Sequence, residues 1–182
     1  MKIGYIDGPR LRRALIAGCK WAQQQRAELN RINVFPVPDG DTGTNLSLTV
    51  QAIADHLEHS TERSVGGVAH EAAQAAVLGA RGNSGMMLSH FLLGFARGLE
   101  GRVRIGASDF GDALEAGVEN LSEALEAPVE GTILTVMRDT ARAVSGAEIE
   151  DIAPLAEHML DRARDSLERT PELLPVLSAA GV

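Results

Sequence analysis

Aromatic residues and cysteine are scarce in this chain of 182 residues. Only 3% of the residues are aromatic, which favours helices over sheets because strands are enriched in aromatic and β-branched side chains. The single cysteine, Cys19, excludes an internal disulfide framework and gives no cysteine spacing for a metal site. At helical spacing Cys19 shares a face with Leu15 and Ala22, so we predict a small core residue.

Long apolar runs and basic clusters are also missing. No segment is apolar for long enough to span a bilayer, and charged residues between Lys2 and Arg13 interrupt any signal-peptide pattern. The net charge of −8 argues against nucleic-acid binding. We therefore expect a cytoplasmic protein, with residues 1–182 forming one domain because no linker divides the chain.

Apolar residues recur at helical spacing in eight segments. The first helix is expected to begin at Asp7-Gly8-Pro9 and to run to about Leu29. The others are expected at about 44–59, 64–78, 86–99, 108–125 (with Ser108 as its cap), 132–144, 152–168 and 170–180. Eight amphipathic helices with short connections predict an all-α fold, an eight-helix antiparallel bundle or closed barrel.

The segment Asn33–Asn45 is the most informative part of the chain, with the sequence NVFPVPDGDTGTN. It holds Asp39 and Asp41 two residues apart in a turn that prolines stiffen and glycines bend, directly before a helix. Oxygen ligands in this pattern suit a hard cation such as Mg²⁺. A carboxylate pair would repel phosphates unless metal ions lay between them, so the segment indicates metal–nucleotide chemistry.

Two further loops carry residues suited to chemistry, at 79–85 and 128–132. The first, third and fifth predicted helices each end at one of the three loops, so an antiparallel arrangement places all three at one end of the molecule. The loop at 79–85 has small residues that let backbone N–H groups approach phosphate oxygens at a helix start. The loop at 128–132 offers Gly131 and Thr132 at another helix start.

Each of these signals has an ordinary structural interpretation when taken alone. Asp-Gly-Asp is common in solvated turns, Gly and Asn are frequent helix C-caps, and Thr132 could serve only as an N-cap. Their expected convergence favours a joint site. The histidines are interpreted as surface or structural residues: His56, His59, His70, His90 and His158.

Four stretches of the sequence resemble a known family: NVFPVPDGDTGTN, GARGNSGMML, EGTILTV and TPELLPVLSAAGV. Together they are similar to the N-terminal kinase domain of bacterial fatty acid kinase. That domain belongs to the DhaL superfamily, named for the nucleotide-binding subunit of dihydroxyacetone (glycerone) kinase. The resemblance implies a barrel of eight antiparallel helices, with ATP or ADP at one end and its phosphates held by two Mg²⁺ ions.

The resemblance also implies roles for individual residues. Asp39 and Asp41 match the last two of three metal-binding aspartates and would be both metal ligands and catalytic residues. Asn33 falls close to the first of the three and would be a metal ligand without charge. The residues implied in nucleotide binding are Thr42, Gly43, Thr44, Asn45, Asn83, Ser84 and Gly85 around the phosphates, with Gly131 and Thr132 near the base and ribose.

The implied reaction is Mg²⁺-dependent phosphoryl transfer from ATP to a fatty-acid carboxylate presented by a separate lipid-binding subunit. An ionised carboxylate needs no general base, which fits a chain without an obvious catalytic histidine. Three alternatives stay open: the nucleotide-binding subunit of a dihydroxyacetone kinase, a non-catalytic ADP/ATP-binding module, and a phosphatase. A homodimer is also left open.

The chain departs from the family pattern at its end. In the family, the Ala-Gly-Val stretch is followed by a glycine-rich segment whose aspartate closes the nucleotide pocket, and then by further domains. This sequence stops at Val182. We therefore expect an excised or truncated domain in which nucleotide binding is retained and catalysis by the isolated chain is in doubt.

Overall fold

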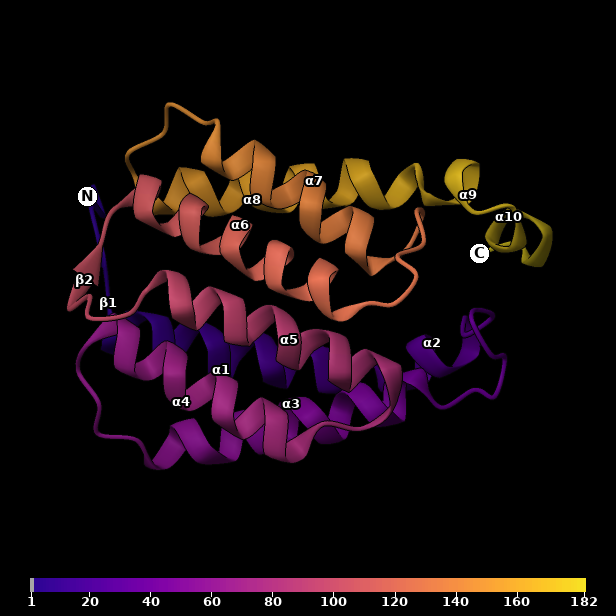
Figure 1. Cartoon of the computed structure of the whole chain (residues 1–182), viewed down its shortest axis with the longest axis horizontal. Coiled ribbons are helices and arrows are strands. Elements are labelled where there is room, and N and C mark those ends of the chain that lie inside the picture. The colour runs from indigo at the N-terminus through magenta and orange to yellow at the C-terminus, as the bar shows by residue number, and fades with distance from the viewer. Residues whose placement is uncertain (1) are drawn as a thin grey trace.

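The computed structural model describes residues 2–182, which form ten helices and one pair of short strands (Figure 1). The all-α prediction is confirmed. The strands β1 (Ile6–Asp7) and β2 (Arg104–Ile105) pair antiparallel. The helices are α1 (Gly8–Gln24), α2 (Arg26–Arg31), α3 (Thr42–His59), α4 (Val65–Gly79), α5 (Gly82–Gly98), α6 (Ala107–Ala124), α7 (Ile133–Ser145), α8 (Ile152–Glu168), α9 (Thr170–Leu173) and α10 (Pro175–Ala180).

Ten helices replace the eight expected ones because the first and the last are each broken once. The first helix breaks at Gln25, whose N–H contacts the carbonyls of Ala22 and Gln23 in a tightened last turn. The last breaks at Leu174, which is extended because the residue before a proline disfavours the helical conformation. The fourth expected helix also begins earlier, at Gly82, so the glycine-rich segment forms its first turn.

The helices form two layers (Figure 1). From α3 to α8 each helix runs antiparallel to the next and packs against it, and α1 lies against both α3 and α4. The first layer therefore contains α1, α3, α4 and α5, the second contains α6, α7 and α8, and the contact between α5 and α6 joins them. The segment before β1 makes a second connection between the layers, because Ile152 N at the start of α8 donates a hydrogen bond to Ile3 O at 2.9 Å.

Small residues allow the helices of the first layer and the α5–α6 junction to pack closely. Alanines fill the buried face of α4: Ala69, Ala72, Ala73 and Ala76. Gly94 of α5 lies so close to the carbonyl of Ala116 that a Cβ there would overlap it. The few aromatics gather at the same junction, where the Phe95 ring meets Phe91 and Phe110 at centroid distances of 6.3 Å and 6.0 Å. Close backbone approach thus explains how a core with few aromatics is filled.

Cys19 lies in the core of the first layer, as the helical pattern predicted. Burial raises the pKa of its thiol to about 11, which makes it an inert core residue at neutral pH. In the part of the chain that the structure describes, every helix is too short or too polar to cross a bilayer.

Three helices, α1, α4 and α8, begin at a residue whose side chain caps the helix. Asp7 Oδ1 accepts a hydrogen bond from Arg10 N at the start of α1, and Ser64 Oγ accepts one from Gly67 N at the start of α4. The prediction that Ser108 caps the fifth helix was wrong. Gly106 is the N-cap of α6, and the Asp109 carboxylate accepts from the Gly106 N–H.

Candidate functional site

The three candidate loops lie at the same end of the molecule, on the right in Figure 1. Helices α3, α5 and α7 all begin at this end, each directly after one of the loops. The short helices α9 and α10 lie at this end too. The N-terminus of a helix carries the positive end of the helix dipole, which favours anions. In α3, however, the N–H groups of Thr42 and Thr44 already donate to Asn33 Oδ1 and Asn30 Oδ1.

Asn33 organises the first loop. Its Oδ1 accepts hydrogen bonds from Asp41 N and Thr42 N, both at 3.2 Å, and from the Thr42 hydroxyl at 2.8 Å. Its amide nitrogen donates to Val37 O at 3.0 Å. One side chain therefore holds both ends of the turn that carries the two aspartates.

Asp39 and Asp41 are exposed on this turn. Asp39 Oδ1 lies 3.4 Å from Asp41 N, and across residues 2–182 neither carboxylate forms an ion pair with a basic side chain. No group of three or more His, Cys, Asp or Glu side chains arranged to hold a metal ion occurs among these residues. Two unpaired carboxylates still fit Mg²⁺, which commonly takes one or two protein carboxylates and completes its shell with water and phosphate oxygens.

Helix α2 forms hydrogen bonds to the first turn of α3. This contact was not predicted from the sequence. Asn30 Oδ1 accepts from Thr44 N at 3.0 Å, and the Thr44 hydroxyl accepts from Asn30 Nδ2 at 3.0 Å and from Arg26 Nε at 3.3 Å. The backbone of α2 approaches so closely that a Cβ on Gly43 would overlap the carbonyl of Arg26. The N–H of Thr44 is therefore used inside the protein, and the predicted phosphate contact through Thr44 stays a prediction.

The second loop lies directly against the first turns of α3. The Ser84 hydroxyl is 3.5 Å from Thr42 O, and a Cβ on Gly82 would lie 2.5 Å from the side-chain nitrogen of Asn45. Gly82 also has a φ of +59°, a conformation that side-chain-bearing residues rarely adopt. The close contact with Asn45 and the positive φ both require glycine at this position. These contacts also bring the predicted residues of the first and second loops together.

The third loop is held by a charged cluster beside the C-terminal segment. Glu130 forms a bidentate ion pair with Arg138 at 2.5 Å and 2.7 Å and accepts from the Thr135 hydroxyl at 2.8 Å. The Arg138 guanidinium, and then the Thr135 hydroxyl, lower the pKa of Glu130 to about 2.

The backbone of the third loop contacts the C-terminal segment. Gly131 faces Thr170 and Leu174, and its N–H donates to the Thr135 hydroxyl at 2.9 Å. Thr132 does not cap α7 with its side chain, because its hydroxyl donates to Val129 O. The structure thus places Gly131 and Thr132 at the same end as the other loops, with their own contacts made to α7 and the C-terminal segment.

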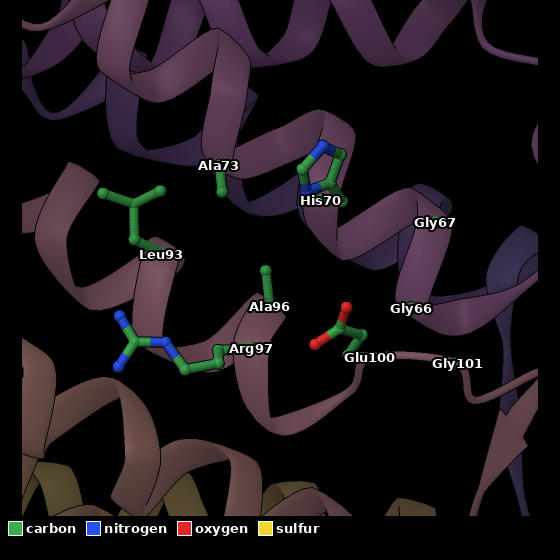
Figure 2. A pocket seen from close by; sticks show the side chains of 9 residues that line it. All are labelled: Gly66, Gly67, His70, Ala73, Leu93, Ala96, Arg97, Glu100 and Gly101. Atoms are coloured by element: carbon green, nitrogen blue, oxygen red, sulfur yellow. The ribbon is translucent and has the colours of Figure 1, made fainter.

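Two hollows in the surface lie away from the paired aspartates. One of about 410 Å³ lies between the first turns of α4 and the last turns of α5, at the opposite end of these helices from the loops (Figure 2). His70, Arg97 and Glu100 surround it, but Arg97 donates to Asn120 Oδ1 at 2.9 Å and the rest of the lining is small or apolar. The second, of about 600 Å³, is lined by Asp139, Arg162, Asp165, Glu168, Arg169 and Glu172.

Comparison with known proteins identifies the family. Residues 36–182 match the DAK2 domain. This chain belongs to the DAK2 domain family. Protein YloV of Bacillus subtilis is 42% identical to it over 184 residues, which cover 100% of this chain and 33% of that relative. Uncharacterised proteins of Staphylococcus saprophyticus and Staphylococcus epidermidis are 39% and 37% identical over 182 residues, covering 99% of this chain and 33% of each relative.

Membership of the DAK2 family confirms the resemblance to a DhaL-type domain that the sequence motifs indicated. DAK2 domains are nucleotide-binding modules of kinase systems that work with partner subunits, and DhaL-type domains bind ADP or ATP. The chain spans about one third of the length of the curated relatives it matches. A kinase-related role follows from the family.

Proposed function

We propose that this DAK2 domain binds ATP and Mg²⁺ for phosphoryl transfer to a fatty-acid carboxylate presented by a separate lipid-binding subunit. The observation that carries the proposal is the meeting of the N-termini of α3 and α5 beside Asp39 and Asp41. Helix N-termini bind phosphate, and carboxylates hold the cations that accompany it. The combination suits a metal–nucleotide complex better than it suits a cation or a phosphate alone.

The residues present divide into three roles in this proposal. Asp39 and Asp41 hold Mg²⁺, with two ions proposed, and Asn33 completes the metal-binding turn. When bound, Mg²⁺ would neutralise charge on the phosphates and on the transferred group. The residues proposed to bind the nucleotide are Thr42, Gly43, Thr44, Asn45, Asn83, Ser84 and Gly85 at the phosphates and Gly131 and Thr132 at the base and ribose.

Asn33 has a more specific role in this proposal than that of a weak metal ligand. Its Oδ1 already accepts three hydrogen bonds, from Asp41 N, Thr42 N and the Thr42 hydroxyl. Coordination of a cation by Oδ1 would therefore exchange some of these bonds. In the free protein, we propose that Asn33 fixes the position of Asp41 relative to the first residue of α3.

The nature of the acceptor rests on the motifs and on simple chemistry. An ionised carboxylate can attack phosphorus without losing a proton, so positioning and charge neutralisation are sufficient. Asn33 in place of a third aspartate argues against the alternative, a dihydroxyacetone kinase subunit. A non-catalytic ADP/ATP-binding module is the other alternative, because the family match supports nucleotide binding but does not by itself show the transfer step. We further propose that residues 1–182 act as one domain.

A transfer assay tests the proposal. Labelled ATP, Mg²⁺ and a lipid-binding subunit loaded with fatty acid are incubated with this chain, and label in the acyl product is measured. We expect Mg²⁺-dependent transfer that Asp41→Ala abolishes and that Asp161→Ala, on the exposed side of α8, leaves unchanged. Transfer to dihydroxyacetone with its own binding subunit would favour the first alternative. Nucleotide binding without any transfer would favour the non-catalytic module.

A further inference from the structure

Thr49 of α3 lies where the first and second loops meet, and it is fully buried, with a relative exposure of 0%. Its hydroxyl donates to Asn45 O at 2.9 Å and accepts from Arg81 N at 3.1 Å. Asn45 belongs to the first motif, and Arg81 is the N-cap of α5. A single hydroxyl therefore joins the first turn of α3 to the start of α5.

Glycines hold the second loop against the same turn of α3. A Cβ on Gly85 would overlap the Thr49 hydroxyl, so the first turn of α5 lies directly on it. Gly79, the last residue of α4, packs on Ala52 in the same way. The second loop thus bends closely around Thr49 as the chain passes from α4 to α5.

The two hydrogen bonds require a group that donates and accepts at once. The hydroxyl uses its proton on the carbonyl of its own helix and its lone pair on the N–H of the neighbouring segment. Valine has nearly the same shape but can do neither. Loss of the hydroxyl would leave Arg81 N without its partner and would remove the hydrogen bond that fixes the start of α5 relative to α3, leaving the packing contacts of Gly82 and Gly85.

We propose that Thr49 is a positioning residue that sets the spacing between the phosphate-binding ends of α3 and α5. This inference rests on the proposed nucleotide site. Thr49 is fully buried, so it would not touch the nucleotide and would act through its bonds to Asn45 and Arg81. The N–H groups of Asn83 and Ser84 would then approach the phosphates together with the first turn of α3.

Thr140 provides a matched control on the other layer. It is a threonine within α7, and its hydroxyl donates to Val136 O at 2.6 Å, four residues earlier, as the Thr49 hydroxyl does to Asn45 O. Within residues 2–182 its hydroxyl accepts no hydrogen bond from another segment. Thr140→Val therefore removes the same bond within a helix without removing a bond between loops.

The experiment is calorimetric titration of the full chain with ADP in Mg²⁺, together with thermal unfolding of each protein without ligand. We expect Thr49→Val to weaken ADP binding about tenfold, the effect of losing one well-placed hydrogen bond across the site. Thr49→Ser keeps the hydroxyl and should bind within about twofold of wild type, and Thr140→Val should bind as wild type does.

Wild-type affinity in a folded Thr49→Val protein would overturn the inference, whereas absence of ADP binding by the wild type would refute the proposed function itself. If Thr49→Val does not fold, Thr49→Ser decides the matter. The Thr49→Ser variant loses only a buried methyl group, so its unfolding temperature should fall while its affinity for ADP is kept. A fall in affinity that parallels the fall in stability would show a merely structural role and overturn the inference.

Discussion

The two layers of the molecule hold their loops in different ways. At the first layer, the neutral hydrogen bonds between Asn30 of α2 and Thr44, the bond from Arg81 N to the Thr49 hydroxyl, and close backbone contacts fix the first two loops. In the second layer, the third loop depends on the Glu130–Arg138 ion pair, whose side chains are 53% and 27% exposed. Salt and pH weaken exposed ion pairs but leave neutral hydrogen bonds nearly unchanged. We therefore expect the third loop to loosen under conditions that leave the first two in place.

Gly43→Ala should have the largest effect on stability, because it places a methyl group where the backbones of α2 and α3 lie in close contact. The added methyl would overlap the carbonyl of Arg26, and backbone cannot move aside as a side chain can. We expect a loss of about 2–4 kcal/mol in the free energy of unfolding, measured in urea. Gly18→Ala on α1 meets open space and is the matched control, expected to stabilise the protein by up to about 1 kcal/mol. Equal stability of the two variants would contradict the close contact between the backbone of α2 and Gly43.

Asn33→Ala should have the next largest effect, again in the first layer. It removes the acceptor for Asp41 N, Thr42 N and the Thr42 hydroxyl, and we expect a loss of about 1–2 kcal/mol in thermal or urea unfolding. Asn33→Asp keeps the acceptor oxygen but loses the amide donor to Val37 O, so it should lower stability less than Asn33→Ala does, and its added charge should tighten Mg²⁺ binding in a direct titration. Weaker Mg²⁺ binding by Asn33→Asp would argue that Oδ1 serves only the loop.

Glu130→Gln tests the second layer through pH. The folded-state pKa of Glu130 is about 2 and lies below its ordinary value of 4.5, so its contribution is present above about pH 4.5 and is lost as the pH falls toward 2. After allowance for exposure, we expect the variant to be less stable at pH 7 by about 0.5 kcal/mol. The difference from wild type should shrink on acidification. A difference that grows below pH 4.5 would contradict the assignment.

Lys2→Ala should have the smallest effect, because the Lys2–Glu150 pair at 2.7 Å is highly exposed on both sides. We expect almost no change in unfolding temperature, since exposed ion pairs contribute little. The nearby backbone bond from Ile152 N to Ile3 O ties the N-terminal lead to α8 without it. A large drop in unfolding temperature would show that the ion pair, and not the backbone bond, joins the layers.

The helices and the common end of the three loops could be predicted from the sequence. Apolar periodicity reports which face of a helix is buried, so α3, α4, α6, α7 and α8 were predicted to within a few residues. The loops then had to share one end because the connections are short and successive helices alternate in direction. The fold and the outline of the site therefore follow from local pattern and topology.

The contacts that shape the site could not be predicted in this way. Asn30 reaches Thr44 only because the first helix breaks at Gln25 and α2 folds onto α3. Thr49 looks like any threonine at a buried helix position until Arg81 N is seen to bond to it. Gly43 and Gly82 are required by neighbours distant in the sequence or by a backbone angle that depends on them. Such contacts are set by tertiary packing, which periodicity does not report.

The most direct test of the account is titration of the chain with ADP, with and without Mg²⁺, comparing wild type with Asp41→Asn. Asp41→Asn keeps the size of the side chain and removes the charge that would hold the cation, and Asp161→Asn on α8 controls for net charge. We predict Mg²⁺-dependent ADP binding by wild type and Asp161→Asn that is weakened at least about tenfold in Asp41→Asn. Equal Mg²⁺-dependent affinity in all three proteins would contradict a metal–nucleotide site at this turn.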